Sequence, residues 1–175
     1  RNEIKWMYEV PEWKTAVIYN GVSAGRFDVD LDVENARRAY DIGPMDPTVL
    51  FCGRLEWQKG PDLLMEAIPW VLRYHSNAKF VFAGDGGMRR DLERRAWQIG
   101  AGSAVRFVGF RDTNDVVRFF KFSDGICVPS RNEPFGIVIL EAWSASKPVV
   151  ATDRGGPSEF VQHDYNGLKI APHPE

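Results

Sequence analysis

Two glutamates joined by a short turn are the residues of this chain best suited to chemistry. Glu133 and Glu141 stand eight positions apart, and Pro134 and Gly136 shape the turn that leads from one to the other. Proline fixes the turn, glycine lets a ligand approach the backbone, and the first N–H groups of the apolar helix that follows attract an anion. With a carboxylate on each side to accept hydroxyl groups, residues 129–141 predict a site for a sugar joined to a phosphate.

Two other interpretations of the glutamate pair stay open. A metal site is weaker, because no Cys or His accompanies the pair and His75, His163 and His173 are distant in the sequence. A glycosidase-like pair of carboxylates is possible in principle. The cations of a second loop favour a phosphate leaving group instead.

That second loop carries two cations around a turn that follows the apolar run 49–52. Arg54 comes after Gly53 at the end of the expected strand, and Lys59 precedes the next helix. Arginine offers a planar fork to phosphate oxygens and lysine a point charge, so the two could converge on a diphosphate. The alternative is a pair of solvated surface cations, which the position at a strand end disfavours.

A glycine-rich loop at residues 84–87 invites a dinucleotide-binding interpretation. Arg89 holds the place of the third glycine in that fingerprint, and Gly109-Phe110-Arg111 stands where a ribose-binding acid is expected. A nicotinamide enzyme is therefore a poor fit.

The elements that must position these loops alternate between strand and helix. Apolar runs are predicted as strands at 49–52, 79–83, 105–108, 125–128, 148–151 and 167–170, with helices between them. Continuous apolar strands separated by helices indicate a doubly wound, mostly parallel α/β sheet of about six strands. The pattern also predicts a short strand at 16–19, a helix around 34–40, and a kink or an early end at Pro69 in the helix that starts with Pro61. Ligands of such a sheet bind beyond the carboxyl ends of its strands.

Composition limits the class of protein. A formal net charge of −2 and a pI near 6.0 predict no nucleic-acid partner. No apolar run approaches the roughly 20 residues of a membrane span, so membrane association is not indicated. Cys52 and Cys127 each lie in a strand-like run, which favours a reducing, cytoplasmic setting over a disulfide framework. The chain starts with Arg1 and ends on an unfinished Pro-His-Pro-Glu, so we expect a piece of a longer protein, with residues 1–15 as a linker and 16–175 as one domain.

From Val17 to Ile170 the chain resembles the C-terminal, donor-binding half of retaining GT-B glycosyltransferases, in the group that includes glycogen- and starch-synthase-like enzymes. The shared motifs are Gly53-Arg54 with Lys59-Gly60, the Gly84-Asp85-Gly86 loop, and the Glu-x7-Glu pattern of Glu133 and Glu141. Phe135 stands where bacterial starch synthases often have Cys, which favours the broader group over a true glycogen synthase.

The resemblance implies roles for single residues. Glu133 would contact the transferred sugar and Glu141 the ribose hydroxyls, while Arg54 and Lys59 would bind the diphosphate. The implied catalytic residues are Glu133, Arg54 and Lys59. The implied donor-binding residues are Gly53, Arg54, Lys59, Gly109, Phe110, Arg111, Glu133, Phe135, Gly136, Ile137 and Glu141. No metal or other cofactor is implied.

The implied reaction moves a hexose from an ADP-, UDP- or GDP-linked sugar to an acceptor hydroxyl of a glucan or another glycoconjugate, with retention of configuration. A facing N-terminal acceptor domain would be missing, so the chain alone is expected to bind donor weakly and to transfer no sugar. The alternatives are a non-catalytic nucleotide-sugar binding module and a GT-B nucleotide-sugar epimerase.

Overall fold

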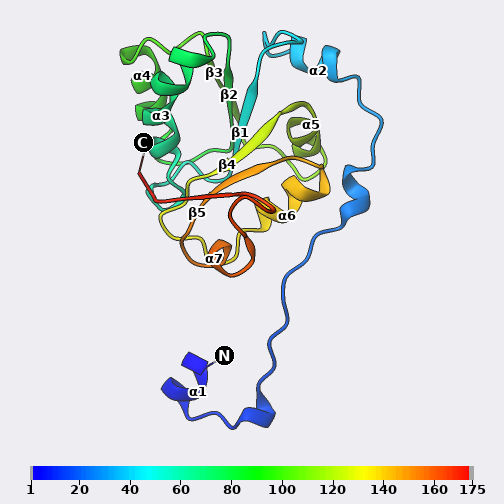
Figure 1. Ribbon diagram of the computed structural model, residues 1–175, viewed down its shortest axis with the longest axis vertical. Coiled ribbons are helices and arrows are strands. Elements are labelled where there is room, and N and C mark those ends of the chain that lie inside the picture. Colours follow the sequence, from blue (N-terminus) through cyan, green and yellow to red (C-terminus); the bar gives the residue numbers. More distant parts are fainter. Residues whose placement is uncertain (1, 174–175) are drawn as a thin grey trace.

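The computed structural model describes residues 2–173, which contain one six-stranded sheet with all strands parallel (Figure 1). The strands lie in the order β3-β2-β1-β4-β5-β6. They are β1 Thr48–Cys52, β2 Lys79–Ala83, β3 Val105–Gly109, β4 Gly125–Val128, β5 Val149–Thr152 and β6 Leu168–Ile170. The predicted Rossmann-like α/β sheet is therefore confirmed, and β1 and β4 meet at its centre, where the strand order reverses direction.

Helices cover both faces of the sheet. They are α3 Pro61–Tyr74, α4 Arg89–Gln98, α5 Asp115–Phe122, α6 Ile137–Ser144 and α7 Pro157–Phe160. In Figure 1, α3 and α4 lie on one side of the strands and α5 and α6 on the other. Because the chain moves outward from β1 in one direction and from β4 in the other, right-handed connections place the two helix sets on opposite faces.

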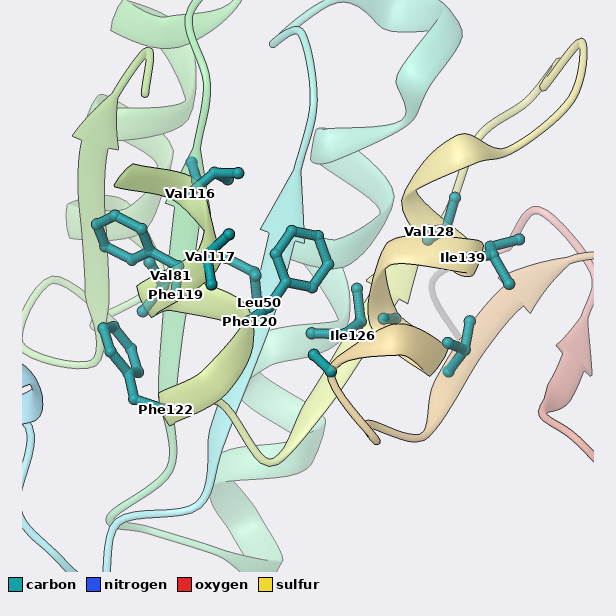
Figure 2. Close-up of a cluster of buried hydrophobic side chains, with 14 of the residues drawn as sticks. Leu50, Val81, Val116, Val117, Phe119, Phe120, Phe122, Ile126, Val128 and Ile139 are labelled. Carbon is teal, nitrogen blue, oxygen red and sulfur yellow. The ribbon is translucent and has the colours of Figure 1, made fainter. Parts of the chain in front are cut away.

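Two hydrophobic clusters follow from this layering. On the α3/α4 side the buried strand residues include Phe51, Phe80 and Phe82. On the opposite side, Leu50 and Val81 alternate with them and pack under α5 and α6. Figure 2 shows that second cluster, in which the apolar side chains of α5 meet those of the central strands. The rigid centre of the sheet thus fixes where the strand ends lie.

The segment before β1 is held to the body by η2 (Ala24–Phe27) and α2 (Val33–Arg38). Phe27 is buried against Phe120, with the rings edge-on and their centroids 5.7 Å apart. Arg37 donates to the Phe122 carbonyl and pairs with Asp124 at 2.9 Å. The helix predicted around 34–40 is confirmed by α2.

The strand predicted at 16–19 is wrong. These residues have no regular structure, and Ile18 is 90% exposed. A short β-branched run becomes a strand only beside a partner that completes its hydrogen bonds, and the chain here runs outside the sheet. Figure 1 shows it leading away from the body to α1 (Asn2–Tyr8), with a single 3₁₀ turn at Glu12–Lys14 between them.

Of the two outcomes predicted at Pro69, the early end of the helix is wrong. Helix α3 continues through this residue to Tyr74, and Pro61 occupies its first turn as predicted. Leu64, Met65 and Ile68 bury one face of the helix against the sheet, and this packing offsets the hydrogen bond that proline cannot make. No helix within residues 2–173 is both long enough and apolar enough to cross a membrane.

Candidate functional site

The loops that follow the strands are joined to one another by backbone hydrogen bonds. Gly53 N–H donates to the Ala83 carbonyl at 3.0 Å, and Leu55 N–H to that of Asp85 at 2.9 Å. Gly84 N–H donates to the Gly109 carbonyl at 2.9 Å, which extends the chain of contacts to β3. The loops after β1, β2 and β3 are therefore held together as one unit.

The loop after β1 also crosses the loop after β4. Gly60 has the left-handed φ of 65°, and its α-carbon faces the Pro129 carbonyl with no room for a side chain. Beside this crossing, the Arg131 guanidinium donates two hydrogen bonds, of 2.8 and 2.7 Å, to the Asp62 carboxylate. The crossing is what brings the cationic loop and the glutamate turn together.

At the crossing, Lys59 meets Glu133. The Lys59 Nζ lies 2.8 Å from Glu133 Oε2, and the buried Ser130 hydroxyl donates to the same oxygen at 2.9 Å. Glu133 Oε1 accepts no hydrogen bond from residues 2–173. Two residues predicted separately, in different loops, are thus brought into contact, and the carboxylate keeps one oxygen for a ligand.

A glycine pair from a further loop supports the glutamate turn. Gly156 N–H donates to the Glu133 carbonyl at 2.8 Å, and a side chain at Gly156 would overlap the backbone of Phe135. Gly155 has a φ of 68° and lies against the Glu133 carbonyl in the same way. The backbone around Glu133 is therefore fixed by contacts that only glycine permits.

The helix predicted to start near Gly136 begins one residue later. Gly136 has a left-handed φ of 95° and caps α6, which opens with Ile137. No hydrogen bond between backbone groups of residues 2–173 uses the N–H groups of Phe135, Gly136 or Ile137. Unpaired N–H groups at the start of a helix can stabilise an anion.

A pocket of about 250 Å³ lies at the ends of the first three strands. Its lining includes Gly53, Arg54, Gly84, Asp85, Phe110 and Arg111. The Arg54 side chain forms no ion pair or hydrogen bond with residues 2–173, and the Phe110 side chain is exposed. Gly109 does not line the pocket, but its carbonyl accepts a hydrogen bond from the N–H group of Gly84, which does. Four predicted residues, Gly53, Arg54, Phe110 and Arg111, thus share one pocket.

Glu141 is paired with a residue that the sequence analysis missed. Arg26 Nη2 lies 3.1 Å from Glu141 Oε1, although the two residues are 115 positions apart. No motif marks Arg26, because it stands in a polar stretch without periodicity. Only the packing of η2 on α6 brings it to the site.

The two cysteines do not supply a nucleophile at neutral pH. Burial raises the pKa of both the Cys52 and the Cys127 thiol to about 12, and the Glu141 carboxylate adds to the effect at Cys52. Within the described residues, no three His, Cys, Asp or Glu side chains are grouped so that they could hold a metal ion.

Two larger hollows, of about 580 and 590 Å³, lie on the face of the sheet beside α3. They are lined mainly by apolar side chains, and no predicted site residue is among them. The smaller, charged pocket at the strand ends is the better candidate, because ligands of open α/β sheets bind there.

Comparison with known proteins shows the family to which the chain belongs. Residues 32–175 match the family described as Glycosyl transferases group 1. An uncharacterized glycosyltransferase of Methanocaldococcus jannaschii is 40% identical over 175 residues, covering 98% of this chain and 45% of the relative. A glycogen synthase of Mycobacterium tuberculosis is 34% identical over 156 residues, covering 89% of this chain and 36% of the relative.

Solved structures share the fold. The HepE protein of Anabaena, crystallised in complex with UDP-glucose, superposes with a TM-score of 0.81 at 29% identity. The match covers 90% of this chain and 43% of HepE. The chain therefore spans less than half the length of the relatives cited here.

Proposed function

Since this chain belongs to the Glycosyl transferases group 1 family, we propose that it is the C-terminal, donor-binding domain of a retaining glycosyltransferase. The enzyme would move a hexose from a nucleoside diphosphate sugar to an acceptor hydroxyl. The observation that carries the proposal is the crossing of two loops that sets Lys59 against Glu133. Arg54 belongs to the same loop as Lys59, and α6 starts shortly after Glu133. We propose UDP-glucose as the first donor to test, because HepE binds it.

The balance of charge in the site supports an anionic ligand. Glu133 is neutralised by Lys59 and Glu141 by Arg26, so neither carboxylate repels a diphosphate with its full charge. Arg54 adds a positive charge that no described residue neutralises. The remaining positive charge of Arg54 would favour the binding of a negatively charged nucleoside diphosphate.

The same groups suit the chemistry of sugar transfer. As the bond between the sugar and the diphosphate breaks, negative charge grows on the leaving oxygen and the sugar becomes oxocarbenium-like. Arg54, Lys59 and the free N–H groups at the start of α6 are preorganised to stabilise that oxygen. Glu133 Oε1 is available to a sugar hydroxyl. These positive groups would carry the leaving-group charge without a metal ion, which extends the proposal to a metal-independent reaction.

Calorimetric titration of the chain with UDP-glucose, ADP-glucose and GDP-mannose tests the donor-binding role. We expect weak binding with a preference for one nucleotide, and UDP-glucose as the strongest of the three. If all three donors fail to bind at millimolar concentration, the proposed role of this domain is wrong.

A substitution at Glu133 separates a sugar-transferring domain from a module that binds only the nucleotide. Glu133→Gln is expected to weaken the binding of UDP-glucose by about tenfold, because the sugar hydroxyl loses a charged acceptor. UDP binding is not expected to weaken, because Lys59 then has no carboxylate to neutralise. The exposed Glu34 on α2 provides the matched control, Glu34→Gln. Equal affinities of Glu133→Gln and the control for UDP-glucose would favour the binding module.

A further inference from the structure

One contact of the site comes from outside the strand-end loops. Arg26 lies on η2, before the first strand, and reaches Glu141 on α6 with a 3.1 Å ion pair. The two side chains are 28% and 15% exposed, so the pair is mostly shielded from water. The attraction within a shielded ion pair is screened less by salt than that within a surface pair. Arg26 can therefore influence the orientation and the charge of Glu141.

The simplest explanation is that the pair anchors η2 to the body. The neighbouring Phe27 already does so, because its ring is 2% exposed and packs against Phe120. A shielded ion pair loses much of its attraction to desolvation and adds little to such an anchor. Anchoring therefore does not account for Arg26.

Comparison with Arg37 points the same way. Arg37 donates through Nε, Nη1 and Nη2 to carbonyl oxygens and to Asp124, as expected of a structural arginine. Arg26 instead leaves its buried Nε–H without an acceptor among the described residues, which is costly. Its guanidinium is thus oriented toward Glu141 at the expense of one of its own donors.

The pair leaves half of the Glu141 carboxylate free. Oε1 is bound by Arg26, and Oε2 accepts no hydrogen bond from residues 2–173. Near Glu141 lies the Cys52 thiol, which is uncharged at neutral pH. Arg26 is therefore the described residue that fixes the rotation of this carboxylate and balances its charge.

We infer that Arg26 is a positioning residue, which orients Glu141 so that Oε2 accepts the ribose hydroxyls of the donor nucleotide. The inference rests on the proposed function, since it assigns the ribose to Glu141. It adds that η2, a segment preceding the sheet, is part of the nucleotide site. By neutralising Glu141, Arg26 also lets an anionic diphosphate lie beside a carboxylate.

The test compares UDP with 2′,3′-dideoxy-UDP, which lacks both ribose hydroxyls, by titration of the whole 175-residue chain. The unsubstituted chain is expected to prefer UDP by at least about tenfold, the size of a lost hydrogen bond to a charged group. Arg26→Gln and Glu141→Gln are each expected to bring this ratio close to one, and the double variant to lower it no further. Arg26→Lys is expected to keep an intermediate ratio. Arg94→Gln, on the exposed face of α4, should keep the full ratio.

The possible results separate this inference from the proposed function. If Glu141→Gln removes the preference for UDP and Arg26→Gln keeps it, the role of Arg26 is wrong and the proposed function stands. Equal weakening of both nucleotides by Arg26→Gln also overturns it, because a purely structural residue would act that way. If the unsubstituted chain binds neither nucleotide, the proposed function is wrong and the inference falls with it. Should Arg26→Gln not fold, a full ratio in Arg26→Lys together with a loss in Glu141→Gln overturns the inference.

Discussion

Replacing Gly60 by alanine is expected to lower the free energy of unfolding by roughly 2–5 kcal/mol. Part of this cost comes from the backbone, because Gly60 has a φ of 65°, which alanine adopts only with strain. The rest comes from the new methyl group, which would overlap the Pro129 carbonyl and crowd Leu63. Since Pro129 O belongs to the backbone, the two loops would have to separate. We therefore expect the contact between Lys59 and Glu133 to be lost as well.

Gly100 provides a matched control for this prediction. It has a similar φ of 73°, and a methyl group added there would meet no atom within 4 Å. Gly100→Ala therefore reports the backbone strain alone, about 1–2 kcal/mol. Urea unfolding of both variants, followed by circular dichroism, gives the difference between them, which is the cost of forcing the loops apart. Equal losses in the two variants would show that the crossing at Pro129 is not tight.

The sheet was predictable from the sequence because its central strands are largely buried. A run such as 79–83 is apolar at nearly every position, and Phe80, Phe82 and Val81 are indeed buried on alternate faces. Such a run has few stable environments other than the centre of a parallel sheet. The turn at Gly136 was also predictable, since proline and glycine before an apolar run indicate a turn into a helix. The left-handed conformation of Gly136 was not, because most residues at a helix N-cap are extended.

What the sequence could not predict depends on contacts between distant segments. The run 16–19 has the composition of a strand, but whether it pairs depends on where the chain passes, and here it passes outside the sheet. The pairing of Arg26 with Glu141 likewise depends on η2 packing against α6. The local sequence pattern predicts neither the unpaired run nor the ion pair, because tertiary packing decides both.

The contact between Lys59 and Glu133 is an intermediate case. Each residue was singled out by its own loop, and the rule for parallel sheets places both loops at one edge. The pairing of these two side chains, however, requires the crossing at Gly60, whose tightness no local pattern shows. The location of the site could therefore be predicted, while its internal hydrogen bonds could not.

Arg54→Ala is expected to weaken the binding of UDP by about 10–100-fold, the range for lost hydrogen bonds to a charged group. Arg54 stands at the end of β1, and no described residue neutralises its charge. A diphosphate there would be held by a guanidinium that makes no competing contact. Titration of the unsubstituted chain and of Arg54→Ala with UDP measures the loss of affinity. Arg94→Ala serves as the control, because Arg94 is an exposed arginine of α4 whose one partner among the described residues is Asp91.

Uridine distinguishes a phosphate contact from a contact with the base. Arg54 lines the same pocket as Phe110 and Arg111, so a role in base binding is a real alternative. If Arg54 binds the diphosphate, the loss in Arg54→Ala should be large for UDP and absent for uridine. Added salt should also weaken UDP binding less in the variant than in the unsubstituted chain, because one charge contact is already missing. Equal losses for UDP and uridine would assign Arg54 to the base pocket and leave the diphosphate to Lys59 and the start of α6.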